Sequence, residues 1–262
     1  MNTAAHTVVI RFSSLGDVVL SGSVTRQLAP VTFVTLPQYA ELAARLPGVT
    51  QVVKWGVDPL PARASRVVDL HASVRSRWAS LQIRGPVARV HRHDMKRRLR
   101  VAFKGHPPKP NVIERYAKAA GVEPAPAPWI EGSGDTAEPR TALLLCPGSR
   151  WATKQWPARH WIDLGQRWKG PVTLLGGPDE KHPIDRIAES IGPHATAVAE
   201  SGFGNTFAAI RSGQLAVAGD TGLLHLCSAF GIPVVGLFGP TTSIDGFWWR
   251  PAGSPSSIAV EH

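Results

Sequence analysis

The sequence predicts an α/β protein with two doubly wound domains that face each other across a cleft. β-Branched runs alternate with helix-like segments in both halves, which indicates parallel sheets with crossover helices. A proline-rich segment interrupts this alternation near the middle of the chain. Hydrophobic residues make up 43% of the 262 residues, enough for two cores. Because such folds bind ligands at the carboxyl ends of their strands, we expect the functional site there.

The first domain is predicted over residues 1–121. Its expected strands are short runs rich in Val, Ile, Thr and Phe, and its expected helices are longer mixed segments. The strands span 7–12, 31–36, 51–55, 67–70 and 87–91, and the helices span 18–28, 38–46, 74–83, 95–103 and 112–120.

A linker is predicted over residues 122–140, because Pro124, Pro126 and Pro128 favour an extended chain and a polar stretch follows them. The second domain is predicted over residues 141–262, where the alternation restarts. Its expected strands span 142–146, 172–175, 215–218 and 234–238, and its expected helices span 158–168, 180–191, 205–211 and 222–230.

The composition excludes several classes of protein. Two cysteines, Cys146 and Cys227, exclude a disulfide framework and favour a reducing compartment. The N-terminus lacks the pattern of a signal peptide, and Gly231 and Pro233 interrupt the longest apolar stretch, 226–238. We therefore expect a cytoplasmic protein that is neither secreted nor membrane-spanning.

Positive charge is concentrated in the first half. Residues 1–130 hold 19 Lys and Arg against 7 Asp and Glu, whereas residues 131–262 hold 10 against 12. This asymmetry indicates an anionic partner for the first half, such as a polyanionic substrate or surface. A solvated basic face is the simpler interpretation, and composition alone does not distinguish the two.

Asp17 follows the first predicted strand and begins a helix, in the stretch Ser13-Ser-Leu-Gly-Asp17. Small residues there let the backbone turn sharply and approach a ligand. A carboxylate at a helix entrance often serves only as an N-cap. The alternative hypothesis is a general base that removes a proton from an acceptor hydroxyl.

Two further strand ends carry polar residues. Pro147-Gly-Ser149 turns after one strand and leads to Lys154, which is either solvated or a cation that offsets charge on a diphosphate. Gly176-Gly-Pro-Asp-Glu180 follows the next strand. Glu180 either stabilises the following helix through the helix macrodipole or accepts hydrogen bonds from ribose hydroxyls.

The most informative stretch is Asp220-Thr-Gly-Leu-Leu-His225, at a predicted strand-to-helix junction. Unpaired N–H groups in the first turn of such a helix form a ready anion site. Gly222 permits close approach of a phosphate, and His225 lies one turn further along. Capping by Asp220 and Thr221 is compatible with this hypothesis, and His225 alone would more often be structural.

Taken in order, these motifs resemble those of the ADP-heptose lipopolysaccharide heptosyltransferases of glycosyltransferase family nine. The matching stretches run from Val8 to Pro240 and also include Asp69-Leu-His-Ala-Ser-Val-Arg-Ser76. The resemblance implies the GT-B fold of two Rossmann-like domains. It also implies an inverting, metal-independent transfer of heptose from an ADP-sugar to a hydroxyl of a lipopolysaccharide core acceptor, with no cofactor.

The resemblance assigns roles to individual residues. Asp17 would be the base and Lys154 the diphosphate contact, both catalytic. The donor site would comprise Ser149, Lys154, Glu180, Asp220, Thr221, Gly222, Leu223 and His225, and the acceptor site Ser14, Gly16, His71, Arg75, Arg97 and Arg98. The basic segment 84–104 would face the anionic, lipid-linked saccharide acceptor, with peripheral contact at the inner face of the inner membrane.

Two alternatives come from other classes of function. A GT-B-like nucleotide-sugar epimerase would share the anion-binding helix start but would need no basic acceptor face. A non-enzymatic nucleic-acid-binding protein would use the basic first half on phosphate backbones. The basic segment has few aromatic residues for base stacking, so we expect no nucleic-acid partner.

Overall fold

The computed structural model describes residues 6–91, 112–126, 128–133, 139–149, 155–199, 202–238 and 257–261, the last range for its backbone only. The chain divides into two compact units. The first unit comprises Met1–Ser13 and Ser21–Ala125, and the second comprises Ser14–Leu20 and Pro126–His262. The start of the first long helix is thus grouped with the second unit.

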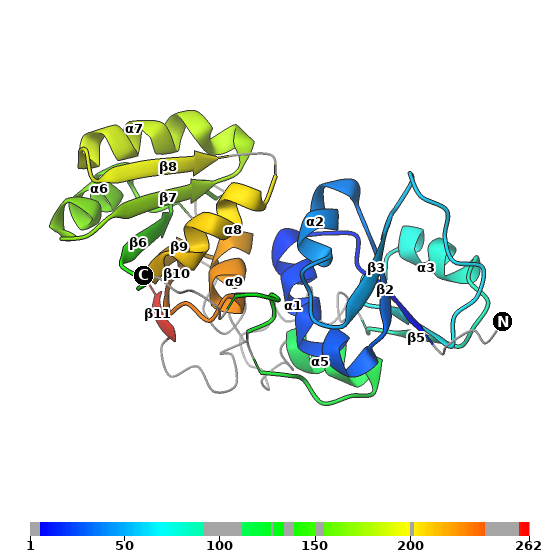
Figure 1. Cartoon of the computed structure of the whole chain (residues 1–262). Helices are drawn as coiled ribbons and strands as arrows, with labels where there is room; N and C mark the ends of the chain where they lie inside the picture. The colour runs from blue at the N-terminus through cyan, green and yellow to red at the C-terminus, as the bar shows by residue number, and fades with distance from the viewer. Residues whose placement is uncertain are drawn as a thin grey trace, which may run out of the picture. The chain divides into compact units, whose positions relative to one another are not determined.

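The first unit contains a sheet of five parallel strands in the order β3-β2-β1-β4-β5. Its strands, right of centre in Figure 1, are β1 (Thr7–Ile10), β2 (Val31–Thr35), β3 (Val49–Lys54), β4 (Arg66–Asp69) and β5 (Val87–Arg89). Its described helices are α1 (Leu15–Thr25), α2 (Ala40–Ala43), α3 (Val74–Leu81) and α5 (Val112–Ala120), with 3₁₀ turns η1 (Arg26–Leu28) and η2 (Pro37–Tyr39).

The core of the first unit explains why these strands form. Every residue of β1 and β2 is buried, as expected of β-branched strands that are covered on both faces. Alternate side chains of β1, Val8 and Ile10, pack with Ala79 and Ile83, at and just beyond the end of α3. The edge strand β3 is more exposed.

All five predicted strands of the first unit are confirmed, and the predicted helix 95–103 lies outside the described residues.

The second unit contains six parallel strands in the order β11-β10-β9-β6-β7-β8. Its strands are β6 (Ala142–Cys146), β7 (Val172–Gly176), β8 (Ala195–Ala199), β9 (Gly213–Gly219), β10 (Val234–Phe238) and β11 (Ser257–Glu261). Its described helices are α6 (Ala158–Arg167), α7 (Lys181–Ile191), α8 (Gly204–Arg211) and α9 (Gly222–Ala229), with the 3₁₀ turn η4 (Pro178–Glu180).

Two strands of the second unit were not expected from the sequence. β8 is a run of Ala and Thr with one Val, which has little intrinsic preference for a strand, and its pairing with β7 supplies the missing stabilisation. β11 pairs with β10 along five residues. The other four strands and the four helices were predicted to within two or three residues at each end.

In both parallel sheets, the order in which strands are added reverses at an equivalent point. From β1 the chain adds β2 and β3 on one side and then returns to place β4 on the other side of β1. From β6 it adds β7 and β8 and then places β9 on the other side of β6. Ligands of doubly wound folds bind beyond the carboxyl ends of strands at such switch points. Each unit therefore offers one such position, after β1 and β4 and after β6 and β9.

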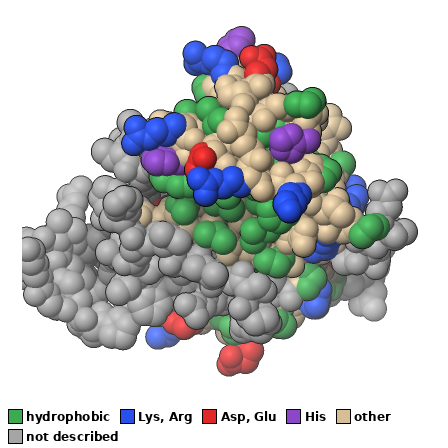
Figure 2. Space-filling model, turned by 90° about the vertical axis from the view of Figure 1, so that its left-hand side faces the viewer, with side chains coloured by type: hydrophobic (Ala, Val, Ile, Leu, Met, Phe, Trp, Pro, Cys, Tyr) green, Lys and Arg blue, Asp and Glu red, His purple; other side chains and the backbone are tan. Residues whose placement is uncertain are grey.

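One face of the second unit carries mixed charge. In the view of Figure 2, basic, acidic and histidine side chains are interspersed among hydrophobic ones. Within the described parts of the chain, no helix is both long and apolar enough to span a bilayer.

Candidate functional site

Glu180 lies at the carboxyl ends of β6 and β7. The N–H of Gly177 donates a hydrogen bond of 2.8 Å to Glu180 Oε2. The same carboxylate lies directly against the α-carbon of Gly148, so a side chain at that position would overlap it. Glu180 therefore caps its own 3₁₀ turn and also lies beside the loop that follows β6. This is the strand end predicted for Glu180, and its contact with a ribose stays a prediction.

The start of α9 lies at the carboxyl end of β9. Thr221 is its N-cap residue, but its side chain makes no capping hydrogen bond. Thr221 Oγ1 is buried and has no hydrogen-bond partner in the described part of the chain. The first-turn N–H groups of a helix also lack intrahelical partners. The segment 220–223 thus brings together the Thr221 hydroxyl and the positive end of helix α9.

His225 lies one turn into α9 and is 9% exposed. Burial lowers the pKa of His225, while the charges of Asp220 and Asp17 oppose that effect. A neutral imidazole is therefore favoured. A Cβ built on Gly16 would lie 2.5 Å from His225 Cδ2, so the absence of a side chain at Gly16 permits this approach.

Asp17 belongs to the first turn of α1, the part grouped with the second unit. Its Oδ2 accepts hydrogen bonds from the Ser14 N–H at 3.2 Å and from Ser14 Oγ at 2.9 Å. The helix begins at Leu15, so Asp17 is its third residue and not its N-cap; it caps the helix by accepting hydrogen bonds from Ser14, the residue before the helix. The carboxylate also lies close enough to His225 to raise its pKa, which places Asp17 near the start of α9. Capping does not remove Asp17 from the candidate site.

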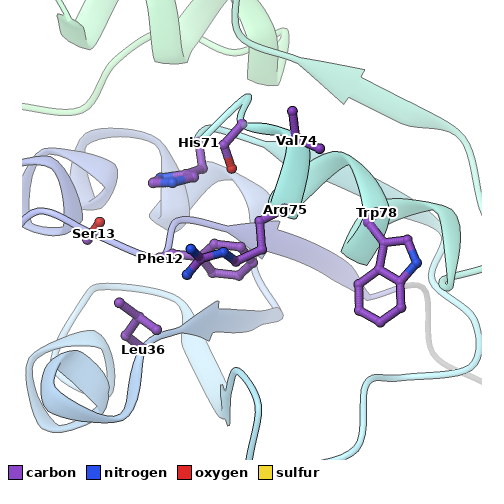
Figure 3. A pocket seen from close by; sticks show the side chains of 8 residues that line it. Phe12, Ser13, Leu36, His71, Val74, Arg75 and Trp78 are labelled. Atoms are coloured by element: carbon purple, nitrogen blue, oxygen red, sulfur yellow. The ribbon is translucent and has the colours of Figure 1, made fainter.

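The first unit has a pocket at its own switch point, after β1 and β4, with a volume of about 680 Å³. Two predicted acceptor residues, His71 and Arg75, line it. Figure 3 shows the Arg75 side chain reaching from α3 in the direction of Phe12, with Trp78 further along the helix. The remaining lining residues are Phe12, Ser13, Leu36, Ser73, Val74 and Trp78.

The aromatic side chains of this pocket were missed by sequence reasoning. The Phe12 ring stacks on Trp55 with ring centres 4.9 Å apart. The rings of Trp55 and Trp78 meet edge to face, with their centres 5.8 Å apart. His71 lies 5.2 Å from the Phe12 ring. The available signal was positional, because Phe12 and Trp55 each follow closely after the end of a strand, as the predicted residue His71 does.

Asp69 holds the loop that carries His71. Its side chain is fully buried and accepts hydrogen bonds from the N–H groups of His71 and Ala72 and from Ser76 Oγ. Arg89 Nε pairs with the same carboxylate at 2.8 Å. Ala72 has a φ of 52°, a conformation that alanine rarely adopts, and the hydrogen bonds to Asp69 stabilise it.

Several predicted residues remain to be placed. Lys154, Arg97 and Arg98 lie outside the described residues. Ser149 is described, and its carbonyl accepts a hydrogen bond of 2.8 Å from Gln155 Nε2. Among the described residues, no group of three or more His, Cys, Asp or Glu side chains is arranged to hold a metal ion.

Comparison with known proteins identifies the family. The sequence model of glycosyltransferase family 9 (heptosyltransferase) matches residues 65–253. The chain belongs to glycosyltransferase family 9. This assignment confirms the resemblance that the ordered motifs indicated, and it favours neither the epimerase nor the nucleic-acid-binding alternative.

A curated relative of this family 9 chain is lipopolysaccharide heptosyltransferase 1 of Pseudomonas aeruginosa. The two are 31% identical over 103 residues, a match that spans 38% of this chain and 29% of that protein. The matched region is thus under a third of the relative's length.

Solved structures show the same fold. The E. coli heptosyltransferase WaaC with ADP superposes with a TM-score of 0.74 at 18% identity, covering 98% of this chain and 93% of that one. E. coli ADP-heptose lps heptosyltransferase II gives 0.70 at 21% identity, covering 97% and 90%. The family 9 protein of Veillonella parvula gives 0.73 at 18% identity, covering 99% and 86%. At these identities the likeness establishes the fold of two Rossmann-like domains.

Proposed function

We propose that this chain transfers a heptose from an ADP-sugar to a hydroxyl of a lipopolysaccharide core acceptor, with inversion and without a metal ion. Membership of glycosyltransferase family 9 carries this proposal. The named activity of the P. aeruginosa relative and the ADP held by the E. coli structure favour this donor and this class of acceptor.

In this proposal the second unit holds the donor. The start of α9, at Thr221 and Gly222, binds the diphosphate through its N–H groups and the buried Thr221 hydroxyl. Glu180 accepts hydrogen bonds from the ribose, and Ser149 lies on the neighbouring loop. Neutral His225 supports this loop, and Lys154 offsets the charge of the leaving diphosphate. Positioned charges and dipoles of this kind usually contribute more to catalysis than any other effect.

Asp17 acts as the general base. Its carboxylate removes the proton from the acceptor hydroxyl as the hydroxyl oxygen attacks the anomeric carbon, and the ADP leaves with the electron pair of the broken bond. The hydrogen bonds from Ser14 hold the carboxylate in one orientation. Attack from the face opposite the leaving group inverts the anomeric configuration.

The first unit binds the acceptor. His71 and Arg75 in the pocket after β4, together with Arg97 and Arg98, supply polar and cationic groups for a phosphorylated saccharide. Ser14 and Gly16, at the start of α1, contact the acceptor beside Asp17. The acceptor is lipid-linked, so the protein works in the cytoplasm in peripheral contact with the anionic inner face of the inner membrane.

The test has two parts. Calorimetric titration should show that ADP binds more tightly than UDP or GDP, and ADP-heptose should label a heptose-deficient lipopolysaccharide core, as detected by mass spectrometry. EDTA should leave the rate unchanged, and the product linkage should have the anomeric configuration opposite to that of the donor. Equal binding of the three nucleotides, or an epimerised free donor as the product, would contradict the proposal.

A further inference from the structure

Helix α3 presents three apolar side chains to solvent. Val74 is 86% exposed, Trp78 is 59% exposed and Leu81 is 80% exposed. They are spaced four and three residues apart, so they lie on one face of the helix. Exposed large apolar residues are common singly, but a row of them on one helix face marks an interaction surface.

Cationic side chains flank this row. Arg75 and Arg77 lie within α3 and Arg84 lies just beyond it, and all three are exposed. Arg75 and Arg77 form no ion pair with any described residue, and α3 itself contains no acidic residue. The helix therefore combines an exposed apolar row with positive charge that forms no ion pair with any residue the structure describes.

The buried side of α3 explains why this row faces outward. Ser76, Ala79 and Ser80 are the buried residues of the helix. All three are small. Ser76 Oγ donates a hydrogen bond to Asp69, and Ser80 Oγ donates one to the carbonyl of Arg77. The core thus takes the small side chains, and the large apolar side chains lie outside it, as in helices that bind at an interface.

We propose that this face of α3, comprising Val74, Arg77, Trp78 and Leu81, docks the protein on the surface of an anionic lipid bilayer. Interfacial helices carry apolar residues that enter the headgroup region and Lys or Arg that pair with anionic lipids, and Trp favours that depth. The choice of a bilayer rests on the proposed lipid-linked acceptor. The N-terminal end of α3 lines the 680 Å³ pocket, so docking would place that pocket near the lipid surface.

The experiment is sedimentation with vesicles of phosphatidylcholine containing 30% phosphatidylglycerol, beside vesicles of phosphatidylcholine alone. The wild type should sediment with the anionic vesicles, and part of the bound protein should dissociate at high salt. Arg77→Gln should weaken binding about fivefold, since each cation near such a surface contributes about 1 kcal/mol. Leu81→Ser should weaken it by a similar factor, and the loss should persist at high salt.

Arg45→Gln, just beyond α2, is the matched control and should bind as the wild type does. Melting temperatures and ADP affinity should be unchanged in all three variants, because neither Arg77, Leu81 nor Arg45 lies in the donor site or lines the pocket. Failure of the wild type to bind anionic vesicles, or undiminished binding by Leu81→Ser and Arg77→Gln, would overturn the proposal and leave the α3 face to a protein partner.

These measurements also separate this inference from the proposed function. Vesicle binding without heptose transfer would contradict the function and retain the docking surface. Transfer to a delipidated core acceptor without vesicle binding would contradict the docking surface alone.

Discussion

The carboxylate of Glu180 lies against the backbone of Gly148 and leaves no room for a side chain there. The contact joins the loop after β6 to the turn after β7, two of the three strand ends of the second unit that carry the proposed donor site. A substitution at Gly148 therefore tests the placement of Glu180 without changing Glu180 itself.

Gly148→Ala should weaken ADP binding about tenfold or more, because the new methyl group displaces Glu180 and a hydrogen bond to a charged group contributes about 1.5–3 kcal/mol. Calorimetric titration measures the change. Gly177→Ala is the matched control, since its φ of −77° suits alanine and a Cβ there would meet Glu180 Oε2 only at 3.9 Å. Equal affinities of the two variants would show that Glu180 does not contact the nucleoside.

Asp17→Asn should retain ADP affinity and lose about a hundredfold or more in turnover, since asparagine can accept the Ser14 hydrogen bonds but is not a base. Steady-state transfer rates, with ADP affinity and melting temperature as controls, check it. Unaltered turnover would reduce Asp17 to its capping role.

Lys154→Ala should lower turnover by about a hundredfold, because it removes a charge that stabilises the leaving diphosphate. The matched control is Lys169→Ala, an exposed lysine just after α6, which should keep the wild-type rate. If both variants transfer heptose at the same rate, Lys154 has no role in the reaction.

Asp69→Ala should destabilise the fold by about 3–5 kcal/mol, because it leaves Arg89 without its buried partner and removes the acceptor for two N–H groups. Asp163→Ala breaks an exposed pair with Arg167 and should cost about 0.5 kcal/mol or less. Urea unfolding compares the two. A similar small loss in both variants would contradict the network described around Asp69.

Stability should fall as the pH decreases below about 6.5, the ordinary pKa of histidine. Burial lowers the pKa of His225 in the folded state, so the unfolded state binds a proton that the folded state resists. This contribution is complete above pH 6.5 and declines toward the lower, folded-state pKa. The nine other histidines remain in His225→Asn, so its urea midpoint should depend less on pH from 7 to 5. Parallel curves for both proteins would show that folding does not lower the pKa of His225.

The sequence by itself determined the alternation of strands and helices, since β-branched runs, glycine turns and helix-starting residues are local signals. It also determined the ordered motifs that indicate family 9, and hence the candidate positions Asp17, Glu180 and Asp220–His225. Local signals failed for β8, whose Ala-rich sequence becomes a strand only because β7 pairs with it.

Only the tertiary structure decided which of these residues meet. The Glu180 carboxylate lies against Gly148, and the His225 ring lies against Gly16. Both contacts join segments that are far apart in the sequence. The aromatic cluster of Phe12, Trp55 and Trp78 likewise forms from three separate segments. The physical reason is that strand order and helix packing set these contacts, and a linear pattern specifies which face a residue occupies but not which distant residue lies opposite.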